Sequence, residues 1–449
     1  MFGSGRAILA LRESYRNDLR LVKEVTDFKY VRFHGILDDD VGVYDTGKRG
    51  KTEYNFSYVD QIYDGLLANG VKPFVEISFM PKALAANPKP HAFWYKPYPS
   101  PPNDPEAWAQ LISAFAQHLV GRYGADEVEQ WYFEVWNEPN IDFWNGDPKQ
   151  DTYFALYKLT ATAIKKVDPK IRVGGPATAQ AVWVDDFIAY CRQEHVPFDF
   201  VSTHIYGNED PVNVFGRAME IPRKDMVARA IQKVHDQVVQ SIAAKIPIFI
   251  TEFNATYMTQ VEVTDSAFMG PWLANTIREC DGLAEMMSYW TFSDVFEEQG
   301  VVKTPFYGGY GLVAERGVPK AAYRAFELLH QLGDERIANE SPDALITKRK
   351  DGALVAAFWN YAEPDEKVAQ KTFHLRVTNR AGKSYRLQVV DPTNGSALAA
   401  WIAMDKPATP TLSQVNKLIE ASKLPPATEH PMNEAIRLNA RALALVTIR

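Results

Sequence analysis

The sequence predicts a (β/α)8 TIM barrel followed by a smaller C-terminal β-sandwich, and two patterns along the chain predict it. Up to about residue 335, eight short apolar runs alternate with longer segments whose apolar residues recur at three- and four-residue spacing. Beyond Leu332 the pattern changes to short, partly alternating runs separated by turns such as Asp351-Gly352 and Asn394-Gly395. We therefore divide the chain into a barrel domain, residues 1–335, and an accessory β-sandwich, residues 336–449.

The predicted barrel strands are short runs rich in apolar and β-branched residues. They are Arg6–Ala10, Tyr30–His34, Pro73–Ser78, Trp131–Glu138, Ile171–Gly175, Phe198–His204, Ile246–Glu252 and Met286–Phe292. Helices are predicted in the intervening segments Tyr58–Asn69, Pro105–Tyr123, Thr152–Val167, Trp183–His195, Met226–Ala244 and Ser266–Asp281. Asp104 and Asp151 stand where two of these helices would begin, and aspartate is a favoured helix N-cap.

An open, doubly wound parallel sheet is the alternative architecture for such an alternation. That fold commonly has a glycine-rich turn after its first strand, whereas the early glycines of this chain, Gly3 and Gly5, precede the first run. The barrel is therefore favoured, and the chemistry of a barrel lies at the C-terminal ends of its strands. Three long polar loops, residues 38–55, 88–104 and 208–222, follow strand ends and are expected to surround that face.

The C-terminal region is predicted to form a sandwich of antiparallel strands. The strands are expected at Ala344–Lys348, Leu354–Asn360, Thr372–Thr378, Tyr385–Val390, Ala435–Leu438 and Leu443–Ile448. Between the later strands, Ser413–Lys423 has the apolar spacing of a small helix flanked by prolines.

Composition and charge argue against several classes of protein and of site. A net charge of −7 over 449 residues gives no basic footprint for nucleic acid or an anionic membrane, and no apolar run could cross a bilayer. Cys191 and Cys280 lie far apart, and His91 and His195 have no partners at metal-ligand spacing, so neither a metal nor a cofactor is expected. Because Met1–Arg6 has no apolar signal segment, a cytoplasmic location is expected for the chain as given.

Two glutamates stand at ends of predicted strands, each in an asparagine-containing turn. Glu138 follows the fourth strand, in Trp136-Asn137-Glu138-Pro139-Asn140, and Glu252 ends the seventh, in Thr251-Glu252-Phe253-Asn254. These strands face each other across a closed barrel, and retaining glycoside hydrolysis needs two carboxyl groups about 5–5.5 Å apart. The apolar neighbours of Glu138 suit a general acid/base, whereas Glu252 suits the nucleophile if hydrogen-bond donors keep it ionised.

Each candidate also has a more ordinary explanation. A glutamate at a strand end can merely neutralise an arginine, and Glu134 is expected to be such a paired structural carboxylate, deeper in the barrel than Glu138. Asn137 can donate to the sugar 2-OH or bond within its own turn. His34 can contact a substrate or be a satisfied core histidine.

Further candidates follow the sixth and eighth strands. His204 and Tyr206 lie next to Glu252 in barrel order and can donate hydrogen bonds to it. Trp290 can stack on a sugar ring. Glu297 and Glu298 can bind sugar hydroxyls or belong to a solvated acidic loop.

The two glutamate motifs resemble those of clan A glycoside hydrolases, and a wider set of segments resembles family 39, the β-xylosidase and α-L-iduronidase family. The further matching segments are Tyr30-Val31-Arg32-Phe33-His34-Gly35, Phe79-Met80-Pro81, Arg122-Tyr123-Gly124, Phe133-Glu134-Val135, His204-Ile205-Tyr206 and Tyr289-Trp290-Thr291-Phe292-Ser293-Asp294-Val295-Phe296-Glu297-Glu298. The resemblance covers nearly the whole barrel. It implies that Glu138 is the acid/base and Glu252 the nucleophile. It also implies substrate contacts at His34, Asn137, His204, Tyr206, Trp290, Glu297 and Glu298.

The activity implied by this resemblance is that of a retaining, exo-acting β-D-xylosidase. Such an enzyme releases xylose from the non-reducing end of xylo-oligosaccharides through a covalent glycosyl-enzyme intermediate. The alternative within the family is an α-L-iduronidase-like activity, which would need a cation such as Lys96, Arg217 or Lys303 near the sugar C5. The alternative from another class is a catalytically silent carbohydrate-binding protein, although intact glutamates at both positions argue against it.

Overall fold

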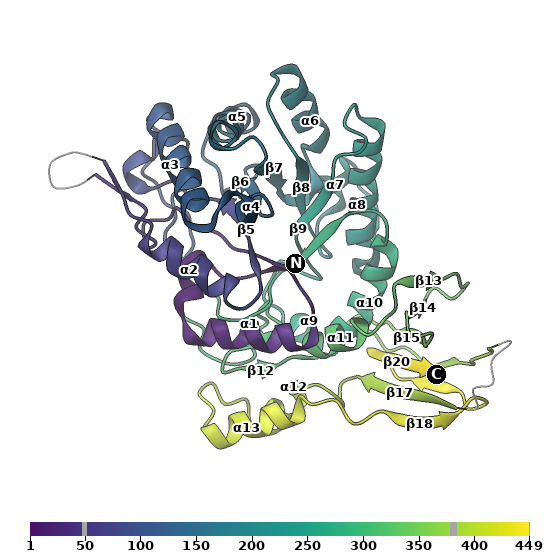
Figure 1. Cartoon of the computed structure of the whole chain (residues 1–449). Coiled ribbons are helices and arrows are strands. Elements are labelled where there is room, and N and C mark those ends of the chain that lie inside the picture. Colours follow the sequence, from purple (N-terminus) through teal and green to yellow (C-terminus); the bar gives the residue numbers. More distant parts are fainter. Residues whose placement is uncertain (47–51, 378–383, 449) are drawn as a thin grey trace.

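The computed structural model describes residues 1–46, 52–377 and 384–448, and in these ranges eight parallel strands close into a barrel (Figure 1). The strands pair in the order β1-β10-β9-β8-β7-β6-β5-β2, with β1 paired to both β10 and β2. They are β1 (Phe2–Gly3), β2 (Tyr30–Arg32), β5 (Lys72–Ile77), β6 (Tyr132–Val135), β7 (Arg172–Thr178), β8 (Phe200–Tyr206), β9 (Ile248–Asn254) and β10 (Met286–Tyr289). The predicted (β/α)8 barrel is therefore confirmed.

Helices cover the outside of this barrel, because their apolar faces need the buried sheet as a partner. The longer ones are α1 (Glu13–Val25), α2 (Ser57–Leu67), α3 (Pro105–Tyr123), α5 (Lys149–Val167), α6 (Val184–Gln193), α8 (Arg223–Gln240), α10 (Met269–Cys280) and α11 (Ala321–Leu329). Shorter ones are η1 (Ala7–Leu11), η2 (Lys82–Leu84), α4 (Ala125–Val128), η3 (Ala179–Ala181), α7 (Pro211–Phe215) and α9 (Val261–Thr264).

The two predicted N-caps have different outcomes. The side chain of Asp104 accepts hydrogen bonds from the backbone N–H groups of Glu106 and Ala107 at 3.0 and 3.1 Å, and so caps α3 as predicted. The prediction for Asp151 was wrong, because α5 begins at Lys149 after Pro148 and Asp151 lies within its first turn. In the first turn its negative charge still interacts favourably with the positive end of the helix dipole.

The prediction of a first strand at Arg6–Ala10 was wrong. The strand is Phe2–Gly3, paired with Val31 and Arg32 on one side, and the segment Ala7–Leu11 is a 3-10 helix. A side chain at Gly3 could not be accommodated, since its Cβ would lie 2.2 Å from the Trp290 ring. A strand of two residues is too short to be recognised from an apolar pattern. The longer apolar run that follows it in the sequence, Arg6–Ala10, matches the pattern of a strand better.

The C-terminal region contains a six-stranded antiparallel sheet of order β13-β14-β15-β20-β17-β18 and a two-stranded sheet of β16 and β19. The strands are β13 (Glu335–Ile337), β14 (Ala344–Lys348), β15 (Leu354–Asn360), β16 (Lys371–Phe373), β17 (Ser384–Val390), β18 (Thr428–Pro431), β19 (Ile436–Leu438) and β20 (Ala442–Ile448). Two helices, α12 (Leu398–Ala403) and α13 (Leu412–Ala421), lie between β17 and β18. The predicted β-sandwich is confirmed, while Thr378, at the end of one predicted strand, lies outside the described residues.

The six-stranded sheet packs directly against the barrel. In Figure 1 it lies beside α10 and α11, and Leu443 and Trp359 belong to the same buried cluster as Leu273 of α10. On its other face, Phe358 packs against Phe373 of β16, with ring centroids 5.0 Å apart. The division at residues 335 and 336 stays a prediction. No helix in the described ranges is long and apolar enough to span a bilayer.

Candidate active site

A cavity of about 400 Å³ opens at the C-terminal ends of the barrel strands. Seven of the nine residues predicted for the site line it, and an eighth, His204, contacts the lining residue Glu138. The lining residues are His34, Phe93, Asn137, Glu138, Ile141, Phe143, Ala179, Gln180, Tyr206, Glu209, Glu252, Tyr257, Trp290, Glu298, Gln299 and Tyr310. Loops after β5 and β8 contribute to this surface as predicted, through Phe93 and Glu209, whereas residues 47–51 of the first predicted loop lie outside the described ranges.

Glu138 follows β6 in a turn that leaves the strand axis. Its backbone has a φ of 44°, and Trp136 has a φ of 76°, so left-handed backbone on both sides of Asn137 turns the chain and brings the Glu138 side chain into the cavity. The turn is held in place because the Glu138 N–H donates to the carbonyl of Ala177 at 2.8 Å. Burial, and then the negative charges of Glu252 and Glu209, raise the pKa of Glu138 well above its ordinary value. This environment favours a protonated carboxylic acid.

Glu252 lies on β9 with both carboxylate oxygens hydrogen bonded. The Tyr206 hydroxyl donates to Oε2 at 2.6 Å, and the Arg32 guanidinium donates to Oε1 at 2.7 Å. A positive charge and two donors stabilise the ionised form and fix its orientation. Tyr206 was predicted to be such a donor, and this contact confirms it. Glu138 and Glu252 therefore form a pair in which burial favours a proton on Glu138, while a cation and a hydroxyl donor bind Glu252.

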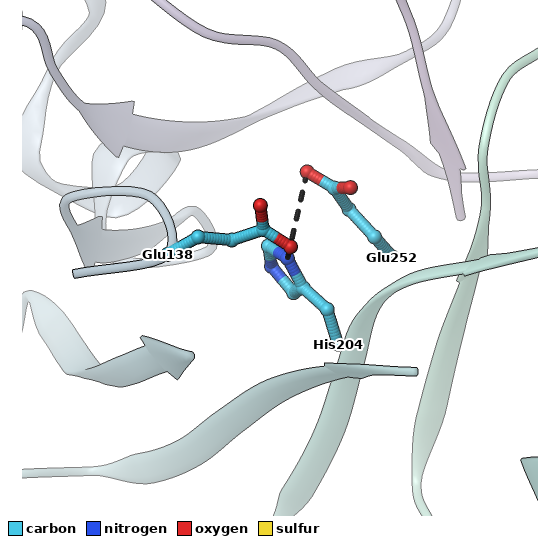
Figure 2. Close-up of side chains that lie close together, drawn as sticks. All are labelled: Glu138, His204 and Glu252. Atoms are coloured by element: carbon cyan, nitrogen blue, oxygen red, sulfur yellow. Dashed lines mark hydrogen bonds and ion pairs between the residues drawn. The ribbon is translucent and has the colours of Figure 1, made fainter. Parts of the chain in front are cut away.

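His204 lies between the two glutamates (Figure 2). Its Nδ1 is 3.0 Å from Glu138 Oε1 and 3.6 Å from Glu252 Oε1. Burial, together with the positive charges of Arg32 and His34, lowers the pKa of His204 well below its ordinary value, so the ring is neutral. A neutral ring puts no positive charge beside Glu138, and it can accept a hydrogen bond from the acid or donate one to the carboxylate, according to its tautomer.

Arg32 connects several buried carboxylates below the cavity. Its guanidinium lies 2.8 Å from Glu76, 2.5 Å from Glu134 and 2.7 Å from Glu252, and it also donates to Asn137 at 3.0 Å. Glu134 accepts a further bond from the Thr251 hydroxyl. The prediction that Glu134 is a paired structural carboxylate is confirmed, since its two oxygens bind Arg32 and Thr251 inside the barrel. Asn137 lines the cavity with its carbonyl oxygen oriented by Arg32, which leaves its amide free to face a ligand.

The β2 and β10 side of the cavity carries His34, Trp290 and Glu298. His34 is bonded through Nδ1 to Glu76 at 2.7 Å, while its Nε2 lies 3.7 Å from Glu252 and 3.9 Å from Glu298. Although burial opposes it, the charge of Glu76 raises the pKa of His34, which favours a ring with two donors. The Trp290 ring lies 4.8 Å from the His34 ring. Burial raises the pKa of Glu298 to about 8.

Glu297 is placed differently from the expectation that it contacts a sugar. Its carboxylate pairs with Arg6 at 3.1 Å and Arg12 at 2.6 Å, and it is not among the residues that line the cavity. The ion pairs with Arg6 and Arg12 hold the Glu297 carboxylate away from the cavity, whereas Glu298 lines it. In this structure Glu297 supports the loop and Glu298 lies at the cavity, and the sugar contacts of both stay predictions.

The loop that carries Glu298 is held by a buried ion cluster. Lys320, fully buried at the start of α11, lies 2.6 Å from Asp265 and 2.5 Å from Asp294, and it donates to the carbonyl of Gly309 at 2.9 Å. Asp265 and Asp294 in turn accept from the backbone N–H groups of Gly308 and Gly311. The segment from Asp294 to Lys320, which includes Glu298 and Tyr310, is thereby tied together at both ends.

A metal ion could be held by one group of residues among those described. One ligand atom each of Glu138, His204 and Glu252 lies within 4.8 Å of the others. However, Glu252 Oε1 already accepts from Arg32, and a cation at this point would replace the proton that the environment of Glu138 retains. The donor set thus fits a proton-transfer pair better than a resident metal.

The chain is similar to known proteins over nearly its whole length. A model of the family described as glycosyl hydrolases family 39 matches residues 1–439 of the chain. The chain belongs to family 39. It is 38% identical over 447 residues to a β-xylosidase of Geobacillus stearothermophilus, covering 97% of this chain and 87% of that one. It is also 37% identical over 436 residues to a β-xylosidase of Caldicellulosiruptor saccharolyticus, covering 94% and 87%.

Solved structures of family 39 have the same architecture. The monomeric β-xylosidase from Caulobacter crescentus CB15 matches the whole of this chain and 95% of its own, with a TM-score of 0.88 and 32% identity. The fold predicted from the alternation of strands and helices is thus that of the family.

Several residues at this family 39 site were not singled out from the sequence. Arg32 and Glu76 are inside strands, where a charged residue between apolar ones is itself a signal of a buried ion pair. Gln180 and Glu209 lie in loops after β7 and β8, where no local pattern distinguishes them from other polar loop residues.

Proposed function

We propose that the protein is a retaining, exo-acting β-D-xylosidase that releases xylose from the non-reducing end of xylo-oligosaccharides. The observation that supports it most is the pair of Glu138 and Glu252, which have carboxyl oxygens within 4.8 Å of each other. The surroundings of Glu138 favour a protonated acid, and the carboxylate of Glu252 accepts hydrogen bonds from Arg32 and Tyr206. Retaining enzymes hold their two carboxyl groups about 5–5.5 Å apart, whereas inverting enzymes leave about 6.5–9.5 Å for a water molecule.

The proposed reaction has two displacement steps. In the first, the ionised oxygen of Glu252 forms a bond to the anomeric carbon while Glu138 gives its proton to the departing glycosidic oxygen. In the second, Glu138, now a carboxylate, removes a proton from water as the water oxygen attacks the anomeric carbon and releases Glu252. His204 stays neutral and can bond Glu138 in both states. Asn137 is proposed to bind the sugar 2-OH with its free amide, while His34, Trp290 and Glu298 hold the terminal sugar.

The charge of the cavity favours a neutral sugar. Its described lining includes the four carboxyl groups of Glu138, Glu209, Glu252 and Glu298, and no lysine or arginine. Lys96, Arg217 and Lys303, the cations considered for a uronate, are not among these lining residues. A carboxylate on the sugar would lose its water without gaining a lysine or arginine partner from this lining, so xylose is favoured over iduronate.

Purified protein is expected to cleave an aryl β-D-xyloside with a kcat/KM more than about a hundredfold above that for an aryl α-L-iduronide, because of the unpaired charge. Release of the aryl group measures both rates, and NMR of the first sugar formed is expected to show the β-anomer. Faster cleavage of the iduronide would contradict the proposal for xylose. An α-anomeric first product would contradict retention, and turnover of neither compound would favour the silent binding protein.

The pH dependence of kcat/KM is expected to follow the proton on Glu138. Since burial and neighbouring carboxylates raise its pKa, the acid stays protonated to a higher pH than an exposed glutamate. Activity is therefore kept below the raised pKa and lost as the pH rises through it. A pH profile measured on a xyloside with a poor leaving group checks this. The Glu138→Ala variant, which lacks the acid and is profiled on a xyloside with an activated leaving group, should not show the same alkaline decline.

A further inference from the structure

The cavity contains a second pair of polar side chains on the side away from His34 and Glu298. Gln180 follows β7 and donates from Nε2 to Glu209 Oε2, at 3.3 Å, and both line the cavity. Glu209 is only 9% exposed, and among the described residues no lysine, arginine or histidine is one of the groups that act on its carboxyl. A buried carboxylate with one hydrogen-bond donor retains capacity for further donors.

The backbone around this pair is held in an unusual conformation. Gln180 and Ala181 have φ values of 65° and 53°, in the left-handed region that residues other than glycine rarely adopt. The Asn140 side chain holds this loop, because its amide donates to the Ala179 carbonyl at 3.2 Å and its oxygen accepts from the Ala179 N–H at 2.9 Å. Such strained backbone persists only where surrounding contacts determine it, and it is common at ligand sites.

The position of the pair relates it to the departing part of the substrate. In the closed barrel, β7 and β8 lie opposite the β2 and β10 side that carries His34 and Glu298. Glu138, which gives its proton to the departing oxygen, is affected more by the charge of Glu209 than by that of Glu298. Glu298 is affected by His34, Glu252 and Glu76, and Glu209 is not among the groups that act on it. Glu209 and Glu298, the carboxyl groups of the cavity outside the reacting pair, therefore lie at opposite ends of it.

An aromatic ring accompanies the pair at the edge of the cavity. Tyr257 lines the cavity while 50% of its surface is exposed, and its ring lies 6.2 Å from the Tyr206 ring in an edge-on arrangement. Its N–H donates to the side chain of Asn208, next to Glu209, at 3.0 Å. An exposed ring beside a hydrogen-bonding carboxylate is the combination that binds a sugar, through its apolar face and its hydroxyl groups.

We infer that Gln180 and Glu209 bind hydroxyl groups of the sugar on the leaving-group side of the scissile bond, with Tyr257 against the face of that sugar. This inference rests on the proposed function and specifies it, because it assigns the preference for an oligosaccharide over a simple glycoside to one pair of residues. Burial raises the pKa of Glu209 to about 7, so its carboxyl can accept or donate a hydrogen bond near neutral pH.

The test compares two substrates that differ only in the leaving group, xylobiose and an aryl β-D-xyloside. In Glu209→Ala, kcat/KM for xylobiose is expected to fall at least about tenfold more than kcat/KM for the aryl xyloside, which has no sugar hydroxyls there to lose. Both assays are run on the acid side of the pH profile, so that altered proton affinity of Glu138 does not contribute. Gln180→Gly, which suits the left-handed backbone, is expected to change the same ratio in the same direction.

A matched control is Glu220→Gln, which removes a carboxylate from an exposed position of the same loop region. It is expected to leave both rates unchanged. If Glu209→Ala and Gln180→Gly lowered the two rates by equal factors, or changed neither, the assignment to the leaving-group sugar would be overturned. If the unaltered protein cleaved neither xyloside, the proposed function itself would fail.

A second measurement tests binding of a sugar on the leaving-group side in a step that does not use Glu138 as an acid. The glycosyl-enzyme is trapped with a 2-deoxy-2-fluoroxyloside, and its reactivation is followed with and without added xylobiose as an acceptor. The acceptor is expected to accelerate reactivation of the unaltered protein and to accelerate that of Gln180→Gly at least about fivefold less. Equal acceleration in both proteins would overturn the inference.

Discussion

Replacing Glu252 with alanine is expected to abolish turnover of an aryl xyloside, with kcat falling by on the order of 10⁵-fold, the scale on which loss of a covalent nucleophile acts. In the structure this carboxylate receives bonds from Tyr206 and Arg32, and no other described carboxylate of the cavity has both a cation and a hydroxyl donor. No neighbouring group can therefore replace it. Azide added to the variant is expected to restore turnover, because the small anion occupies the space of the lost carboxylate, and NMR should show a glycosyl azide of inverted configuration.

The Glu138→Ala variant is the matched comparison, since it removes a carboxylate of the same pair. A substrate with an activated leaving group needs no proton, so it should still form the glycosyl-enzyme, and azide should then give a product of retained configuration. Opposite product configurations from the two variants would distinguish nucleophile from acid/base. Near-normal rates in both variants, or the same configuration from both, would contradict the assignment of these roles.

Replacing Arg32 with methionine is expected to lower the free energy of unfolding by about 3–5 kcal/mol, the cost of breaking a buried ion pair from one side. Arg32 is fully buried, and its removal leaves Glu134 without a cation and Glu76 with His34 as its remaining partner inside the barrel. Methionine keeps most of the side-chain volume, so loss of packing contributes little. Urea unfolding followed by circular dichroism measures the change.

The control for this prediction is Arg20→Met, at an exposed ion pair in which Arg20 lies 2.9 Å from Glu13. Exposed pairs contribute little because water and salt screen them, so this variant should unfold close to the unaltered protein. Equal unfolding midpoints for the two variants would show that the buried carboxylates do not depend on Arg32.

The elements that could be predicted from the sequence are those with long periodic patterns. The apolar spacing of Pro105–Tyr123 and the runs at Ala344–Lys348 and Leu354–Asn360 match α3, β14 and β15. The two edge strands β13 and β18 were missed because most of their residues are exposed and polar, so no apolar alternation marks them. The first barrel strand was misplaced because only its pairing with β2 and β10 defines it.

The same contrast applies to the site. Glu138 and Glu252 could be predicted, because a glutamate at the end of an apolar strand must lie at the C-terminal face of the barrel. Tyr206 followed from barrel order. The separation of Glu297 from Glu298 could not be predicted, because it depends on Arg6 and Arg12, which lie far away in the sequence. Gln180 and Glu209 likewise become a pair only when two loops meet.

The buried cluster of Lys320, Asp265 and Asp294 links substrate recognition to the accessory domain. Lys320 begins α11, and that helix packs on β17 and β20 of the six-stranded sheet. The segment bearing Glu298 is therefore supported from the domain that holds no catalytic glutamate. A barrel separated from its sandwich would keep both members of the reacting pair but lose this support for the side of the cavity that is proposed to hold the terminal sugar. Under the proposed function, the accessory domain therefore contributes to the shape of the site.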